Sequence, residues 1–267
     1  MRKDFTADTV SGGADETAFV EAYWTRIWEQ EGGPKGAVGK IPKKPEFRIM
    51  RPYLDRLPEG ARLLDGGCGL GDWTLYFSRN RLPTLGLDIS RETVAKLESL
   101  FPEADFAIGD IRATGLPDAS FDGYFSWGTF EHFEEGLAPC VAEAWRVLKP
   151  GGYLFITVPF DNLRMALIKA FDSKRETAPA DRPMRFYQWR LTREELRECL
   201  SAGGFEVLDI KPIHKRQGVL RSLHHEFGLS YKWVVSKALS VLLAPFLPGV
   251  VFSHMIMAVA RKPPARD

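Results

Sequence analysis

The sequence predicts an α/β fold built on a mostly parallel sheet. Three short apolar segments each end in an acidic residue, at Asp65, Asp88 and Asp110. Residues with helical periodicity follow the first two segments, and the spacing between Asp65 and Asp88 fits one strand-helix-strand unit. Strands that alternate with helices in this way lie parallel in a sheet that has helices on both faces.

A glycine-rich loop follows the first apolar segment directly, in the order Asp65-Gly66-Gly67-Cys68-Gly69-Leu70-Gly71. Glycines let the backbone turn tightly and approach a ligand, and the helix expected from Asp72 directs its amino end at the same place. The spacing fails the Gly-x-Gly-x-x-Gly pattern of dinucleotide sites, and no P-loop Lys-Ser/Thr follows. A carboxylate at the strand end would repel a pyrophosphate but suits a ligand that carries an ammonium and a sulfonium.

The pattern Asp65-x-Gly67-x-Gly69-x-Gly71 resembles motif I of the class I S-adenosylmethionine-dependent methyltransferases. Residues 116–127 and 145–156 resemble later motifs of the subgroup that includes the ubiquinone and menaquinone methyltransferases, and the resemblance covers about residues 60 to 160. It implies a Rossmann-like sheet of seven strands, mostly parallel, with helices on both faces and helical cap insertions. The antiparallel last strand would be residues 255–260.

The resemblance also implies a ligand and a set of contacts. S-adenosyl-L-methionine would be the cofactor and S-adenosyl-L-homocysteine the product, with a methyl group moved to an O, N or C atom of a small, apolar or lipid-linked acceptor. Asp88 would accept the ribose hydroxyls, Ile89 would pack on the adenine and Asp110 would accept the adenine amino group. The expected cofactor-binding residues are Asp65, Gly66, Gly67, Gly69, Asp88, Ile89, Asp110, Ile111 and Trp127. The alternative is a regulatory or assembly protein that binds the cofactor without turnover.

His132, in Thr129-Phe130-Glu131-His132-Phe133, is the candidate general base for a hydroxyl or carbon-acid acceptor. The alternative is a histidine that only packs or hydrogen-bonds near the cofactor. Candidate substrate contacts are Tyr23, Trp24, Phe160 and Tyr187. The other histidines and the three cysteines lack metal-ligand spacing, so no metal is expected.

Two regions are expected along the chain. Residues 1–58 should form a helical lid or cap, because aromatic residues from Phe19 to Trp28 recur at helical spacing. These aromatics either cover the ligand or pack on the sheet. Residues 59–267 should form the methyltransferase domain, with cap insertions at about 160–191 and 216–252. A chain of 267 residues with 45% hydrophobic content can build one such domain with a cap.

Residues 231–244 place the polar residues Lys232, Ser236 and Ser240 on one narrow helical face and leave a broad apolar face. Prolines soon after this segment argue against a membrane span. Four interpretations of residues 230–250 remain open: core packing, a cap over an apolar substrate, a helix on a membrane surface and a homodimer contact.

The charges nearly cancel, with 36 basic and 35 acidic residues and no long basic block, so no nucleic-acid partner is expected. Cys68, Cys140 and Cys199 lie far apart, which fits unpaired thiols in a reducing compartment. The first residues lack the apolar core of a signal peptide. We therefore expect a cytoplasmic protein, either free or peripheral to a membrane.

Overall fold

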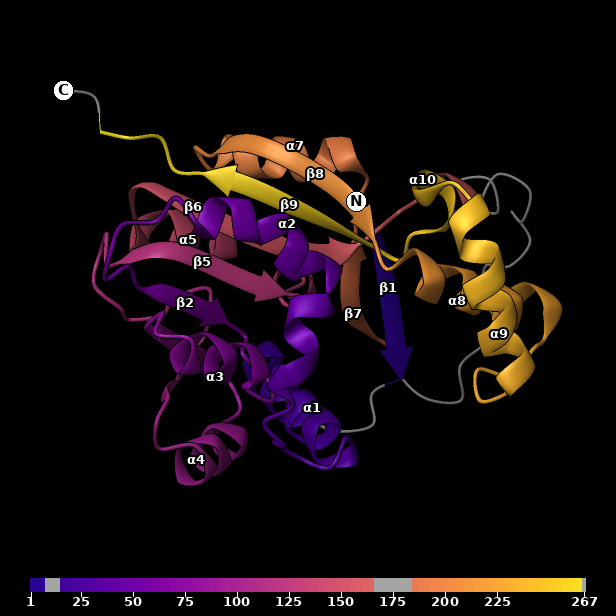
Figure 1. Ribbon diagram of the computed structural model, residues 1–267, viewed down its shortest axis with the longest axis horizontal. Coiled ribbons are helices and arrows are strands. Elements are labelled where there is room, and N and C mark those ends of the chain that lie inside the picture. Colours follow the sequence, from indigo (N-terminus) through magenta and orange to yellow (C-terminus); the bar gives the residue numbers. More distant parts are fainter. Residues whose placement is uncertain (8–14, 166–183, 266–267) are drawn as a thin grey trace.

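The computed structural model describes residues 1–7, 15–165 and 184–265. Its main sheet has seven strands in the order β4-β3-β2-β5-β6-β9-β8 (Figure 1). The parallel strands are β2 (Leu63–Gly66), β3 (Thr84–Asp88), β4 (Asp105–Ile108), β5 (Phe121–Trp127) and β6 (Leu148–Pro159). The last strand, β9 (Met255–Arg261), pairs antiparallel with β6 and with β8 (Glu206–Ile213). The predicted sheet is confirmed.

Helices cover both faces of this sheet because both sides of its strands are apolar. Leu63, Phe125 and Phe155 belong to one buried cluster, which packs with residues of α2 (Pro45–Leu54) and α3 (Asp72–Arg79). Their neighbours Leu64 and Tyr124 belong to another cluster, with residues of α5 (Ala138–Val147) and α7 (Arg193–Ala202). Successive strand residues point to opposite faces, so these near-continuous apolar runs are typical of a sheet buried on both sides.

Local sequence sets where two of the helices begin. Ser90 caps α4 (Arg91–Leu100) by accepting a hydrogen bond from the Thr93 backbone N–H. At α7, Thr192 and Glu195 form a reciprocal capping box. These caps satisfy backbone donors that would otherwise lack partners at the helix starts.

The segment 1–58 contains the expected helix α1 (Glu16–Gln30), followed by the 3-10 helix η1 (Val38–Lys43) and by α2. It also contains a strand that the sequence does not predict. β1 (Arg2–Ala7) pairs antiparallel with β7 (Met184–Arg190), and Figure 1 shows this small sheet between the main sheet and α8. Most of the predicted insertion at about 160–191, namely residues 166–183, lies outside the described residues.

The predicted insertion at about 216–252 forms α8 (Lys215–Phe227), α9 (Val234–Leu243), the 3-10 helix η3 (Ala244–Phe246) and α10 (Gly249–Phe252). α9 buries its polar side, because Ser236 and Ser240 are fully buried. Its apolar side is exposed, so core packing is the wrong interpretation of that face. Within the described ranges, the structure holds no helix that is both long and apolar enough to cross a bilayer.

Candidate functional site

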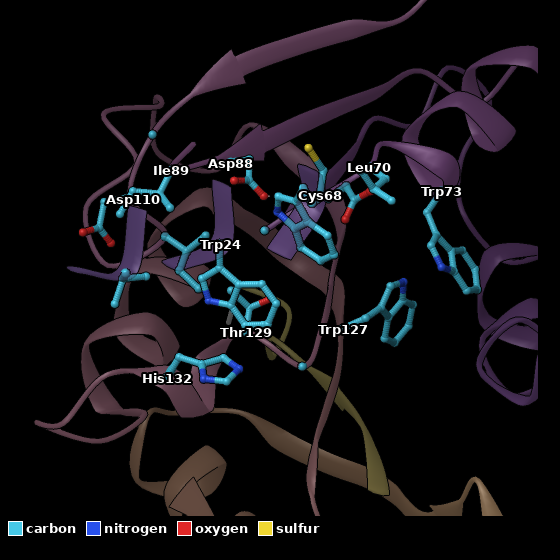
Figure 2. A pocket seen from close by; sticks show the side chains of 18 of the residues that line it. Trp24, Cys68, Leu70, Trp73, Asp88, Ile89, Asp110, Trp127, Thr129 and His132 are labelled. Atoms are coloured by element: carbon cyan, nitrogen blue, oxygen red, sulfur yellow. The ribbon is translucent and has the colours of Figure 1, made fainter. Parts of the chain in front are cut away.

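A cavity with about 1020 Å³ of empty space, partly open to solvent, lies at the carboxyl ends of β2, β3, β4 and β5 (Figure 2). The strand order reverses direction between β2 and β5, which is where open α/β sheets bind ligands. The lining includes the predicted residues Asp65, Gly67, Gly69, Asp88, Ile89, Asp110, Ile111 and Trp127, and it omits Gly66. Sequence motifs separated along the chain therefore meet in one cavity.

The loop after β2 requires glycine at two positions. Gly67 and Gly69 adopt left-handed backbone conformations, with φ of 75° and 53°. A Cβ on Gly67 would lie 2.5 Å from Thr129 Oγ1, and one on Gly69 would lie 2.8 Å from the Trp28 ring. Gly67 N–H also donates to the Leu87 carbonyl oxygen at 2.7 Å, which fixes the loop against β3. The loop is thus a backbone cradle with little room for side chains.

Two buried carboxylates lie beside this cradle. Asp88 accepts hydrogen bonds from the backbone N–H groups of Gly69 at 2.8 Å and Ser90 at 3.0 Å. Asp65 accepts one from Thr74 Oγ1 at 2.8 Å. Burial raises the pKa of both carboxyls, and it raises that of Asp65 to about 7, against the Thr74 hydrogen bond and with added repulsion from Asp88. A cation placed here would offset the cost of ionising both acids.

Asp110 lies on the opposite side of the cradle from Trp127 and is held by Arg112. Arg112 Nη2 donates to Asp110 Oδ2 at 2.7 Å, and its Nη1 donates to Glu16 Oε2 at 2.7 Å. Glu16 is the first residue of α1, so this network joins the lid helix to the end of β4. The Asp110 carboxylate faces the cavity with its charge already balanced.

His132 lies in the 3-10 helix η2 (Phe130–His132), just after β5. Its Nδ1–H donates to the Tyr187 carbonyl oxygen at 2.7 Å, because a carbonyl can only accept. The neutral ring therefore keeps its lone pair on Nε2, which lies 4.0 Å from Glu131 Oε1. Burial lowers the pKa of His132 to about 4 and raises that of Glu131 to about 8. Both groups are uncharged at neutral pH.

Aromatic rings of α1 cover the cavity. Trp24 stacks on Trp28 with ring centroids 5.1 Å apart, and its ring lies 4.9 Å from that of His132. Figure 2 shows Trp24 between Asp88 and His132. Of the four candidate substrate contacts, only Trp24 lines this cavity. Tyr23 and Tyr187 contact each other outside this lining, at 5.7 Å between ring centroids.

The fourth candidate, Phe160, lines a separate cavity at the end of β6. The structure therefore does not bring the four candidate substrate residues together around one space.

Sequence reasoning missed several residues of the site. Lys44 lines the cavity and helps to lower the pKa of Asp65, Thr74 bonds to Asp65, and Thr129 packs against the glycine loop. Thr129 lies three residues before His132 and just after the predicted fourth strand, so its sequence position indicated that it could lie near the site. No sequence signal indicated Lys44 or Thr74, because a lysine before a helix and a threonine within a helix are common on any protein surface.

No group of three or more His, Cys, Asp or Glu side chains in the described part of the chain is arranged to hold a metal ion. The expectation of a metal-independent site stays a prediction.

Comparisons with known proteins agree with this geometry. Residues 64–156 match the family model for a methyltransferase domain. A probable S-adenosylmethionine-dependent methyltransferase of Mycolicibacterium smegmatis is 32% identical over 151 residues, 56% of this chain and 54% of the relative. A 2-methyl-6-phytyl-1,4-hydroquinone methyltransferase of Synechocystis is 32% identical over 163 residues, 57% of this chain and 51% of the relative. The chain thus spans about half the length of these curated relatives.

A solved structure supports the fold. The Burkholderia thailandensis 1,6-didemethyltoxoflavin-N1-methyltransferase, with bound 1,6-didemethyltoxoflavin and S-adenosylhomocysteine, superposes with a TM-score of 0.58 at 17% identity. The match covers 98% of this chain and 96% of that one. With its matched domain and its sheet order, the chain is similar to the class I S-adenosylmethionine-dependent methyltransferases.

Proposed function

We propose that this protein transfers a methyl group from S-adenosyl-L-methionine to an O, N or C atom of a small acceptor. The observation that carries the proposal is one cavity that joins the glycine cradle, the buried carboxylates Asp65 and Asp88, and an aromatic wall with His132. A non-catalytic regulatory or assembly role would need the cofactor cradle but not the wall beside it.

The residues present fit this cofactor. The carboxylates of Asp65 and Asp88 suit an ammonium, a sulfonium and ribose hydroxyls, and the bare backbone of Gly67 and Gly69 permits close approach. The buried Trp127 Nε1 has no hydrogen-bond partner among the described residues and offers a donor. When bound, the cofactor supplies an electrophilic methyl group, while the chain orients both reactants and excludes water.

The acceptor proposed here is apolar, at least at the end that enters this cavity. Trp24, Val20 and Phe133 form an apolar wall on the side of His132. We assign His132 the role of general base, since its Nε2 is unprotonated at neutral pH. An apolar acceptor with a hydroxyl or an acidic C–H fits this wall.

The test begins with calorimetric titration of the protein with S-adenosylmethionine, S-adenosylhomocysteine and NAD. We expect the first two to bind and NAD not to bind. A screen of apolar hydroxyl compounds should then yield S-adenosylhomocysteine with at least one acceptor. Binding without S-adenosylhomocysteine formation by any acceptor would favour the regulatory or assembly role, and binding of NAD alone would refute the cofactor assignment.

The affinity for S-adenosylmethionine should depend on pH through Asp65. Its pKa of about 7 means that the carboxyl gains a proton as the pH falls, and a neutral Asp65 attracts a cation less. The affinity should drop roughly 8-fold between pH 7.5 and pH 6 if binding requires the ionised form. Titrations across this range check the slope, and Asp65→Asn should bind more weakly with no such slope. A wild-type affinity that rises toward pH 6 would contradict the placement.

We further propose that the protein associates peripherally with an anionic membrane surface through an apolar face on α9 and η3. The exposed side chains of this face are Trp233, Val234, Val235, Val241, Leu242, Leu243 and Phe246. Lys232 and Lys237 are exposed in the same segment, and no acidic residue occurs from Phe227 to Arg266. Apolar side chains flanked only by cationic charge complement anionic lipids. A free pool in the cytoplasm fits the three unpaired cysteines.

Sedimentation with phosphatidylglycerol vesicles tests this face. The double variant Leu242→Glu and Phe246→Glu should bind at least about 10-fold more weakly, because it removes two apolar side chains and adds repulsion. The control is Leu100→Glu, which changes an exposed leucine on the distant helix α4. Vesicle binding that survives in the double variant would refute the proposal. A dimer in light scattering that this variant dissociates would assign the face to a homodimer instead.

A further inference from the structure

A second cavity lies along the same edge of the main sheet as the first. It has about 860 Å³ of empty space, partly open to solvent. Phe160 follows the end of β6, and His254 precedes β9, whose antiparallel pairing places its start at the carboxyl end of β6. Because β6 is the immediate neighbour of β5, this cavity lies beside the first one along that edge.

The lining of this cavity is cationic. It includes Arg164, Arg190 and Arg221, and among the described residues Glu226 is its only carboxylate. Arg164 already forms an ion pair with Glu226. Arg190 Nε donates to Asp4 Oδ2 at 2.7 Å. Two of the three guanidinium groups are therefore neutralised by acids of the chain.

Arg221 is the guanidinium without such an acid. It lies on α8, is partly buried, and forms no hydrogen bond or ion pair with any described residue. Its charge acts on the groups around it, since it contributes to the lowered pKa values of His254 and His225. The pKa of His254 falls to about 3, mainly through burial, so this imidazole is neutral and adds no charge. A partly buried guanidinium without a counter-charge favours binding of an anion.

Polar groups for such an anion are present in the same wall. Ser253 is 1% exposed, and its Oγ has no hydrogen-bond partner among the described residues. The Arg164 Nε atom is likewise buried and without a partner. Buried donors of this kind are rare in folded proteins unless a water or a ligand completes them.

Tyr187 lies beside His132, although it lines neither cavity. Its backbone carbonyl holds His132, and its ring lies 5.1 Å from the His132 ring. Arg221 is among the charges that act on the Tyr187 hydroxyl. The two cavities open along the same sheet edge, and an acceptor long enough to reach from His132 past Tyr187 would place its other end near Arg221.

We infer that the second cavity binds an anionic group of the acceptor, a carboxylate or a phosphate, with Arg221 as its principal contact. This inference rests on the proposed methyl transfer and narrows its substrate class to acceptors with an apolar body and an anionic end. The guanidinium fork matches both oxyanions bidentately.

Calorimetry with octyl phosphate, octanoate and octanol tests the inference without any methyl transfer. The variants are Arg221→Gln, which removes the charge, and Arg221→Lys, which keeps it. The control is Arg216→Gln, which changes an exposed arginine on the same helix. Affinity for S-adenosylhomocysteine is measured separately in every protein.

At least one of the two anionic probes should bind at least about 10-fold more tightly than octanol, and Arg221→Gln should remove that advantage. Arg221→Lys should retain most of it, and Arg216→Gln should match the wild type. The anionic probe that binds more tightly identifies the preferred oxyanion. Displacement of octyl phosphate by inorganic phosphate would show that the phosphate group is recognised without its alkyl chain. Equal affinity for octanol and both anions, or unchanged anion binding in Arg221→Gln, would overturn the inference. Absent S-adenosylhomocysteine binding would instead refute the proposed function.

Discussion

Replacing Asp88 with alanine should lower the affinity for S-adenosylmethionine and S-adenosylhomocysteine by about 100-fold or more. The proposed contacts are two hydrogen bonds from ribose hydroxyls to an ionised carboxylate, each worth about 1.5–3 kcal/mol. The change also leaves the Gly69 and Ser90 N–H groups without their acceptor, so the cradle itself loosens. Calorimetric titration of both ligands measures the loss.

The matched control for this experiment is Asp105→Ala, which removes an exposed carboxylate at the start of the neighbouring strand β4. It should bind both ligands like the wild type. Thermal unfolding of each variant separates lost binding from lost folding. Wild-type affinity in a folded Asp88→Ala protein would show that the ligand does not lie where Asp88 ends β3.

The acidic residues of the site could be predicted because each one ends an apolar run. Parallel strands expose their carboxyl ends at one edge of a sheet. The strand-helix alternation therefore predicts that Asp65, Asp88 and Asp110 lie close together. The glycine positions followed for a similar reason, since backbone conformation at Gly67 and Gly69 excludes a Cβ. These predictions depend only on local sequence, namely on which residue types occur at the ends of the strands and in the loop.

The parts that could not be predicted depend on contacts between distant segments. β1 pairs with β7 across most of the chain, from Arg2 opposite Arg190 to Ala7 opposite Met184. Neither strand has the periodic apolar pattern that signals a buried sheet, since each is partly exposed. The bond from His132 to Tyr187 depends on β7 lying beside η2.

The orientation of α9 has a different cause. Helical periodicity separates a polar face from an apolar one, but it does not decide which face the rest of the molecule covers. Here Ser240 Oγ donates to the Lys237 carbonyl oxygen at 2.7 Å, which lowers the cost of burying that hydroxyl, whereas the buried Ser236 Oγ has no partner among the described residues. The apolar face is then left exposed, as is typical of contact surfaces.

Replacing His132 with glutamine should slow turnover about 100-fold while the affinity for S-adenosylmethionine changes by less than about 3-fold. A hydroxyl becomes a far stronger acid as a methyl group attaches to its oxygen, so even a histidine with a pKa of about 4 can accept that proton. Single-turnover formation of S-adenosylhomocysteine separates this step from binding, and His224→Gln on α8 is the control. If His132→Gln turns over like the wild type, His132 only packs against Trp24 and Tyr187 and the acceptor loses its proton elsewhere.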